Sequence, residues 1–310
     1  MSVLSRPYFH DEEKAFDFLE SVIWADGKVC PHCGGLDRIT KVKANPAKRI
    51  RLGLWRCGDC KKQFTVKVGT VFEHARVPLN KMLQAVYLLS SSKKGFSAHQ
   101  LHRALEVTYK TAWFIAHRVR EAMRTGHLAP FGGEGGVVEI DETYIGRKPG
   151  VVMRRGWAHM MPVLALVHRE SGTARSWVLD KCDRDNIMPL VKDNIDRETY
   201  VMTDDANVYK LQLRPIFLGH GVVVHSKGEY GRGRVHTNTV EGYFSIFKRG
   251  MKGVYQHCSS KHLHRYVAEF EFRYNNREGH GINDPERAVE ALKGIVGKRL
   301  TYGGPAPRSA

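Results

Sequence analysis

Three acidic motifs follow one another in the chain at positions where carboxylates could hold metal ions. Asp141 lies in Val-Glu-Ile-Asp-Glu-Thr-Tyr-Ile, Asp204 in Met-Thr-Asp-Asp, and Glu241 three residues after Asn238. Mg²⁺ prefers hard oxygen ligands and keeps positions open for water and phosphate. Two such ions about 3.5–4 Å apart can serve an in-line displacement at phosphorus. A strand-borne Asp, a strand-end Asp and a helical Glu therefore predict a two-metal centre for phosphodiester chemistry.

Two of these positions have neighbours that could serve instead. Asp204 and Asp205 would point to opposite faces of a continuing strand, so only one of them can be a ligand, and Asp204 is favoured because it ends an apolar run. Asn238 lies one turn before Glu241 and could also reach the site. Glu241 is favoured because a carboxylate lowers the cost of holding two cations and an amide does not. Lys248 lies two helical turns after Glu241 and is predicted to contact phosphate from nearly the same face.

Four of the six cysteines form two C-x-x-C pairs, Cys30 with Cys33 and Cys57 with Cys60. In a chain without a secretory signal, two such pairs about two dozen residues apart are typical of a zinc ribbon, because each pair presents two thiolates on a tight turn. A redox pair is the alternative. The spacing predicts that these four sulfurs bind Zn²⁺.

Residues 97–123 have the pattern of a helix-turn-helix. A capped short helix is predicted for 97–105, and a longer one from about Thr108, in which Ala112, Ile115 and Val119 repeat at helical spacing and should face inward. The first turn of such a second helix can dock in the major groove. A plain helical hairpin is the alternative. The side chains expected to contact DNA or project towards it are Tyr109, Lys110, Trp113, His117, Arg120 and Arg124.

The charge of the chain agrees with a polyanionic partner. Its 310 residues include 49 Lys and Arg against 32 Asp and Glu, a formal net charge of +17, and residues 1–126 alone hold 22 basic and 11 acidic side chains. This excess indicates nucleic acid or an anionic membrane surface, with a solvated basic face as the alternative. No apolar stretch reaches the roughly 18–20 residues that span a bilayer, and the N-terminus lacks the apolar core of a signal peptide, which predicts a cytoplasmic protein.

The sequence beyond residue 136 changes to an α/β pattern. A mixed five-stranded sheet flanked by helices is expected, with three adjacent antiparallel strands, a helix over 187–195 and mainly helices from about residue 238. The predicted strands are 137–141, 161–168, 174–179, 200–203 and 221–225. The predicted domains are an N-terminal segment with the zinc ribbon (1–76), a helix-turn-helix domain (77–125), a Gly-rich linker (126–136), the α/β domain (137–298) and a flexible tail (299–310).

This order of elements resembles the RNase H-like fold of the DDE recombinases. The motifs resemble, more closely, the bacterial insertion-sequence transposases that carry an N-terminal zinc ribbon, and the resemblance covers roughly residues 25 to 280 in order. The motifs that carry it are the C-x-x-C pairs, Gly-Phe-Ser-Ala-His-Gln-Leu, Thr-Ala-Trp-Phe, Glu-Ile-Asp-Glu-Thr-Tyr-Ile-Gly, His-Thr-Asn-Thr-Val-Glu-Gly-Tyr-Phe and Phe-Arg-Tyr-Asn-Asn-Arg.

The resemblance implies a nucleoid-associated DNA transposase that binds the terminal repeats of its element and cleaves and joins DNA. Asp141, Asp204 and Glu241 would then bind Mg²⁺ or Mn²⁺. The implied partners are double-stranded DNA, at the element ends and the target, and further copies of the chain in a synaptic complex. One alternative is a DNA-binding regulator derived from a transposase, without catalysis. Another is a metal-dependent nuclease of the same fold that acts on hybrids or junctions.

Overall fold

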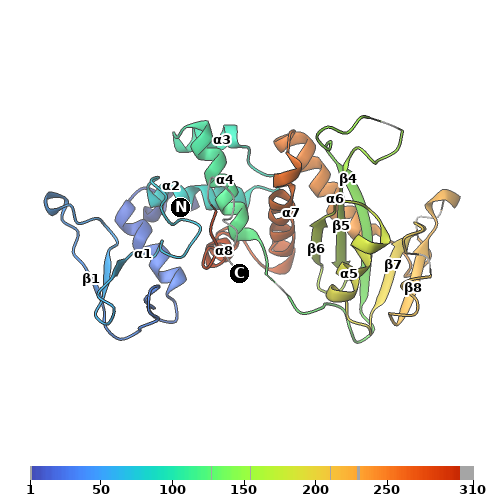
Figure 1. The fold of residues 1–310 in the computed structure, drawn as a ribbon, viewed down its shortest axis with the longest axis horizontal. Helices are drawn as coiled ribbons and strands as arrows, with labels where there is room; N and C mark the ends of the chain where they lie inside the picture. Colours follow the sequence, from blue (N-terminus) through green and yellow to red (C-terminus); the bar gives the residue numbers. More distant parts are fainter. Residues whose placement is uncertain (1, 127, 154, 210, 229–230, 301–310) are drawn as a thin grey trace. The chain divides into compact units, whose positions relative to one another are not determined.

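The computed structural model describes residues 2–126, 128–153, 155–209, 211–228 and 231–300. Figure 1 shows the elements of the chain. The α-helices are α1 (Glu12–Ile23), α2 (Leu79–Ser91), α3 (Ala98–Leu105), α4 (Tyr109–Met123), α5 (Arg184–Asn194), α6 (Asn238–Gly250), α7 (Ser260–Asn275) and α8 (Asp284–Lys293). The strands are β1 (Ile39–Lys41), β2 (Trp55–Cys57), β3 (Gln63–Phe64), β4 (Val137–Ile145), β5 (Met161–His168), β6 (Thr173–Val178), β7 (Tyr200–Asp204) and β8 (Gly219–Val223).

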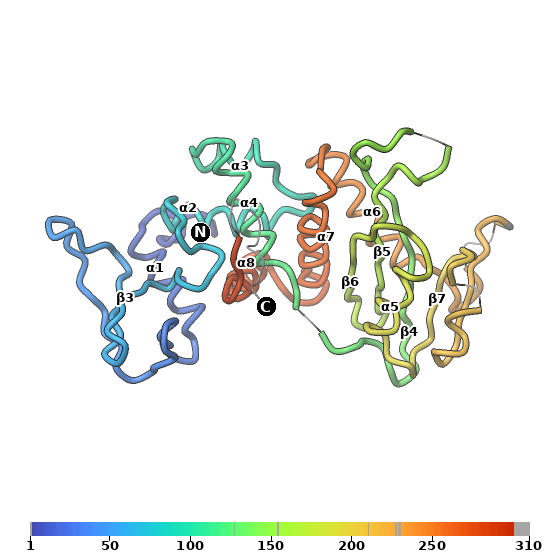
Figure 2. Tube along the Cα trace, in the orientation of Figure 1, coloured from blue at the N-terminus to red at the C-terminus, as the bar shows by residue number. Residues whose placement is uncertain are grey.

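The chain forms two compact units. The N-terminal unit comprises Met1–Arg124 together with Gly281–Ala310, and the sheet unit comprises Thr125–His280. Figure 2 shows the chain entering α8, which packs against α1, α2 and α4 of the N-terminal unit. The predicted α/β domain, which continued to residue 298, therefore differs from this division at its end. The sequence pattern marks α8 as a helix but not the unit whose core it joins.

The sheet unit is built on a five-stranded mixed sheet in the order β6-β5-β4-β7-β8, which confirms the predicted fold class. β4, β5 and β6 pair antiparallel, whereas β7 is parallel to β4 and β8 is parallel to β7. Apolar residues of α6 and α7 share one core with one face of the sheet, and α5 covers the opposite face. β4 lies at the centre, so its side chains are held between both layers.

The N-terminal unit holds the cysteine pairs and the two helices predicted after them. β1, β2 and β3 form a small antiparallel sheet, although the alternating, β-branched sequence of residues 64–72 would favour a longer third strand than β3. The backbone turns after Phe64: Val68 N–H donates to Thr65 O, and Gly69 adopts a φ of +74° that ends any regular strand. Both α3 and α4 begin at caps, with Ser97 and Gln100 forming a capping box and Thr108 capping α4.

The Gly-rich segment predicted to be a linker is bonded to the sheet unit. Phe131 N–H donates to Asn194 O at 3.0 Å, and Gly133 N–H donates to the Thr199 hydroxyl at 2.8 Å. A Cβ on Gly132 would lie 2.2 Å from that hydroxyl oxygen, so only glycine permits this approach. Most of the predicted flexible tail, residues 301–310, lies outside the described residues. Among the described helices, none is long and apolar enough to cross a bilayer.

The place of α8 in the N-terminal unit can be tested by substitution. Leu292 is buried on α8, so Leu292→Ala should lower the free energy of unfolding by about 2–5 kcal/mol. Val296, just beyond the helix, is 53% exposed, and Val296→Ala should cost no more than about 0.5 kcal/mol. Urea unfolding of the full chain measures both. Equal losses for the two variants would contradict the packing of α8.

Candidate functional site

The first two acidic motifs meet on neighbouring parallel strands. β4 pairs with β7 so that Glu139 is opposite Met202, and two residues further along each strand lie Asp141 and Asp204. Side chains alternate along a strand, so Asp141 shares a face of β4 with Glu139. The same face carries Ile145, which packs in the core with α6. The register therefore brings both aspartates to the side of the sheet that α6 covers.

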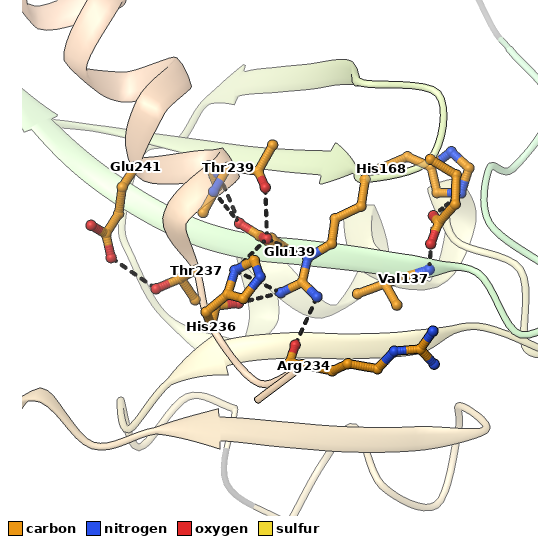
Figure 3. A network of polar contacts seen from close by, with 11 residues as sticks. Val137, Glu139, His168, Arg234, His236, Thr237, Thr239 and Glu241 are labelled. Atoms are coloured by element: carbon orange, nitrogen blue, oxygen red, sulfur yellow. Dashed lines mark hydrogen bonds and ion pairs between the residues drawn. The ribbon is translucent and has the colours of Figure 1, made fainter. Parts of the chain in front are cut away.

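Helix α6 brings Glu241 to this face, and the buried carboxylate of Glu139 on β4 accepts hydrogen bonds from the start of the helix. Glu139 is 0% exposed, and its Oε2 accepts N–H groups of Thr239 at 2.8 Å and Val240 at 2.9 Å, in the first turn of α6. Thr237, the residue before the helix, donates its hydroxyl to Glu241 Oε1 at 2.8 Å. Figure 3 shows these contacts between β4 and the start of α6. Glu241 is thus oriented by the residue that opens its own helix.

Negative charge accumulates around Asp141. Burial raises the pKa of Asp141 to about 8, and the carboxylates of Glu142, Asp204 and Glu241 add to the rise. Glu142 points to the other face, where its Oε2 accepts the Tyr209 hydroxyl at 2.5 Å, and burial also raises its pKa. A buried carboxyl surrounded by other carboxylates favours the proton-bound form, or a bound cation in place of the proton. The donor set is all oxygen, which fits Mg²⁺ or Mn²⁺.

A pocket of 670 Å³ opens beside Asp141 and Glu241. It is lined by those two carboxylates, by Phe244, Ser245 and Gly253, and by three basic side chains of α6 and the turn after it. The basic residues are Lys248, Arg249 and Lys252. α6 continues into a π-helical turn over Met251–Tyr255. The pocket therefore joins carboxylates that suit cations to basic groups that suit phosphate.

Asp205 and Asn238, the alternatives to Asp204 and Glu241 as metal ligands, lie in different surroundings from those two residues. Asp205 accepts a hydrogen bond from the Ser226 hydroxyl at 3.2 Å, whereas the Asp204 carboxylate helps to raise the pKa of Asp141. Asn238 is the first residue of α6 and is exposed. The residues that line the pocket with Asp141 include Glu241 and not Asn238.

The four paired cysteines form a zinc-ribbon centre in the N-terminal unit. Their sulfurs all lie within 4.8 Å of one another, with Cys30 to Cys60 and Cys33 to Cys57 each 3.7 Å apart. Zn–S bonds of about 2.3 Å in a tetrahedron place sulfurs about 3.8 Å apart, so the spacing fits the ion. In the part of the chain that the structure describes, no other group of three potential ligands is this compact, so the acidic side chains are neighbours at wider spacing.

In α4, the second helix of the predicted DNA-binding motif, the exposure of two side chains differs from the prediction. Tyr109 and Lys110, in its first turn, and Arg124, just beyond its end, are exposed, and Trp113 is half-buried. His117 and Arg120, expected to project outward, are 0% and 2% exposed. The prediction for these two side chains was wrong because a polar side chain on a helix can also face the core. The inward positions, among them Ala112, Ile115 and Val119, are buried as predicted.

Sequence reasoning missed Glu139, Arg169 and Thr237. Arg169, just after β5, donates from Nε to Glu139 Oε1 at 2.5 Å and from Nη1 to Arg234 O at 2.7 Å. One signal was present: Glu139 lies between Val138 and Ile140 in a buried strand, and an acid in a buried strand needs a partner. Nothing in the sequence named Arg169 as that partner, because it lies 30 positions away.

Comparison with known proteins gives two family matches. Residues 134–275 match the ISXO2-like transposase domain, and residues 10–63 match the transposase zinc-ribbon domain. A protein of Halobacterium salinarum, described as an uncharacterized protein in transposable element ISH50, is 29% identical over 286 residues, covering 86% of this chain and 91% of that protein. A chain in the structure of a simian T-cell lymphotropic virus intasome with PP2A regulatory subunit B56 gamma matches with TM-score 0.30 and 12% identity, over 62% of this chain and 65% of that one. A similarity this low supports no conclusion.

The zinc centre can be tested on the purified protein without DNA. Cys57→Ser should reduce bound zinc from about one ion per chain to a small fraction and lower the melting temperature, because structural zinc sites contribute folding free energy directly. Cys258→Ser should keep its zinc, since Cys258 lies outside the cluster. Elemental analysis of the purified variants measures both. A full complement of zinc in Cys57→Ser would exclude this site.

Proposed function

This chain belongs to the insertion-sequence transposases with an N-terminal zinc ribbon, and we propose that it cleaves and joins DNA at the ends of its element with two divalent metal ions. The observation that carries the proposal is the electrostatic environment of Asp141. Its buried carboxyl is repelled by the carboxylates of Asp204 and Glu241, and it lies beside a pocket lined by basic side chains. The register of β4 with β7 and the contact of Glu139 with the start of α6 support this arrangement.

In this proposal Asp141 lies between the other two carboxylates. Its pKa responds to both Asp204 and Glu241, so these three carboxylates would together hold the ions. When bound, the two ions would activate the attacking oxygen and stabilise the leaving one. Lys248 lines the same pocket and would hold a non-bridging phosphate oxygen of the strand that is cut. Asn238 is assigned no metal-binding role.

Two successive displacements at phosphorus account for the reaction. Water attacks first, the bond between phosphorus and the 3′ oxygen breaks, and a 3′ hydroxyl is freed at the element end. That hydroxyl then attacks a target phosphodiester, so a new P–O bond forms as a target bond breaks. Because the two DNA ends must be joined to one target, we propose that at least two copies of the chain act together.

DNA recognition is assigned to the N-terminal unit. Tyr109 and Lys110 are exposed at the start of α4, where the helix dipole favours phosphate and where a recognition helix presents its side chains. The positive charge of residues 1–126 supports binding to the DNA backbone. The zinc ribbon stabilises this unit and adds further basic surface.

The two aspartates of the second motif give the decisive comparison. Asp204→Asn should lower cleavage of an element-end duplex by about 100-fold or more, because even outer partners of metal ligands cost about 10–100-fold. Asp205→Asn should retain activity within about tenfold, since that carboxylate bonds Ser226. Gel-based cleavage with Mg²⁺ measures both, and a gel shift checks that DNA binding persists.

The outcomes separate the proposed function from its alternatives. Loss in Asp205→Asn with activity retained in Asp204→Asn would reverse the ligand assignment. A wild-type protein that binds the element ends but cuts no DNA with Mg²⁺ or Mn²⁺ would favour a regulator. Faster cleavage of RNA–DNA hybrids than of element ends would favour a nuclease.

A second comparison tests the exposed turn of α4. Lys110→Ala should weaken DNA binding several-fold on all sequences and reduce the salt dependence of log K by about one unit of slope, as for a lost phosphate contact. Arg120→Ala should instead lower thermal stability, because Arg120 is buried. Affinity measured at several salt concentrations distinguishes them. An unchanged salt slope in Lys110→Ala would remove this residue from the interface.

A further inference from the structure

Helix α6, which carries Glu241, is not capped by the side chain of the residue that precedes it. Thr237 occupies the cap position of α6 and accepts no N–H of the helix; its hydroxyl is donated to the Glu241 carboxylate. By contrast, the cap residues Ser97 of α3 and Asp183 of α5 bind the N–H groups of their own helices. Without a cap bond from Thr237, the N-terminal N–H groups of α6 need acceptors elsewhere.

Glu139 supplies the missing acceptor from β4, about 100 residues away. Its Oε2 accepts Thr239 N–H at 2.8 Å and Val240 N–H at 2.9 Å, and its Oε1 accepts the Thr239 hydroxyl at 2.8 Å. A carboxylate at this position also interacts favourably with the positive end of the helix dipole. The start of α6 is thus fixed to one residue of the central strand (Figure 3).

Arg169 and His236 hold the Glu139 carboxylate in place. Arg169 Nε donates to Glu139 Oε1, and Arg169 Nη2 donates to His236 O at 2.7 Å. His236 Nδ1 lies 3.2 Å from Glu139 Oε1. The charge of Glu139 is therefore compensated by a guanidinium and two backbone N–H groups. Its two oxygens are both occupied, so it has little capacity left to bind an ion.

The contacts of Glu139 with Arg169 and with the start of α6 form the Glu139 clamp, and its position along β4 matters for Asp141. Glu139 and Asp141 lie two residues apart on the same face of β4, a spacing of about 6.6–6.8 Å. Val240, which the clamp holds, directly precedes Glu241. Fixing Val240 to Glu139 therefore fixes where Glu241 lies relative to Asp141, and Thr237 sets the direction of its carboxylate.

We propose that Glu139 is a positioning residue that sets the separation of Asp141 and Glu241 and so the affinity of the acidic site for divalent ions, with Thr237 orienting Glu241. This role rests on the proposed function of the same site. Glu139 itself would touch neither metal nor DNA. A purely structural role would lower stability without changing how the remaining carboxylates bind an ion.

Binding of Mn²⁺ to the full-length, zinc-loaded protein without DNA tests this directly. Electron paramagnetic resonance counts free Mn²⁺, and the Asp141→Ala variant defines binding elsewhere on the protein. In Glu139→Gln the side-chain NH₂ must face either the helix N–H groups or Arg169. We expect the Kd for Mn²⁺ to rise about 10–100-fold, as for other partners of ligating groups.

Glu271→Gln is the matched control. Glu271, on α7, is 7% exposed and also accepts a backbone N–H, that of Ser176 at 2.7 Å, together with the hydroxyls of Ser176 and Thr125. It is another buried carboxylate of the sheet unit, away from the pocket that Asp141 and Glu241 line. Its amide variant should lower the melting temperature to a similar degree and leave the Kd for Mn²⁺ unchanged.

Thr237 provides a second pair that does not depend on burial of a charge. Thr237→Val keeps the shape and removes the donor to Glu241, so it should weaken Mn²⁺ binding, whereas Thr237→Ser keeps the hydroxyl and should restore it. If Glu139→Gln is folded and binds Mn²⁺ as the wild type does, or if Glu271→Gln weakens binding equally, the positioning role is wrong. Should Glu139→Gln fail to fold, equal Mn²⁺ affinity in Thr237→Val and Thr237→Ser would overturn it.

The same experiment keeps the two proposals apart. If Asp141→Ala binds as much Mn²⁺ as the wild type, the acidic site holds no ion and the proposed function itself fails. If only the Asp141→Ala variant loses binding, the metal site stands and the clamp is merely structural.

Discussion

The alternation of side chains along β4 is the constraint on which the acidic site depends. Glu139 and Asp141 face the same side of one central strand, yet their surroundings are opposite. Glu139 meets Arg169 and two N–H groups, so its charge is neutralised by the protein. Asp141 meets Asp204 and Glu241, so its charge is opposed. One strand thus carries a carboxylate whose charge is compensated and, two residues further on, a carboxylate that faces other carboxylates.

This arrangement stores an electrostatic cost at the site. A carboxylate whose pKa is raised to about 8 by burial and by neighbouring carboxylates is poorly solvated in its charged form. Packing elsewhere must offset that cost, and the two apolar cores on either side of the sheet do so. A divalent ion would relieve the repulsion, so its binding should stabilise the sheet unit as well as complete the site. The Glu139 clamp matters here because repulsion alone would drive Glu241 away from Asp141.

The sequence predicted the sheet well because its strands are apolar runs bounded by turns, as in Met161–His168, whose limits agree with β5. Asp141 and Asp204 were expected on strands for the same reason, and they lie on β4 and β7. Prediction from the sequence failed where contacts between distant segments decide the outcome. His117 and Arg120 are polar yet buried, and Arg169 meets Glu139 only after β4 and β5 have paired. Helical periodicity reports which side chains can share a face, but it does not report what a polar side chain will meet there.

The packing of α8 in the N-terminal unit affects the order in which the two units can fold. Leu292 and Ile295 are buried in the N-terminal unit, Val71 N–H donates to Ile295 O, and a Cβ on Gly294 would lie 2.3 Å from Ala122 O. These contacts need residues from both ends of the sequence, with the whole sheet unit between them. During synthesis, when domains generally fold from the N-terminus onward, this core cannot close until after the residues of the sheet unit have been made. The unit to which we assign DNA recognition therefore completes its fold last, so a truncated chain would contain the acidic site but lack the finished core that supports α4.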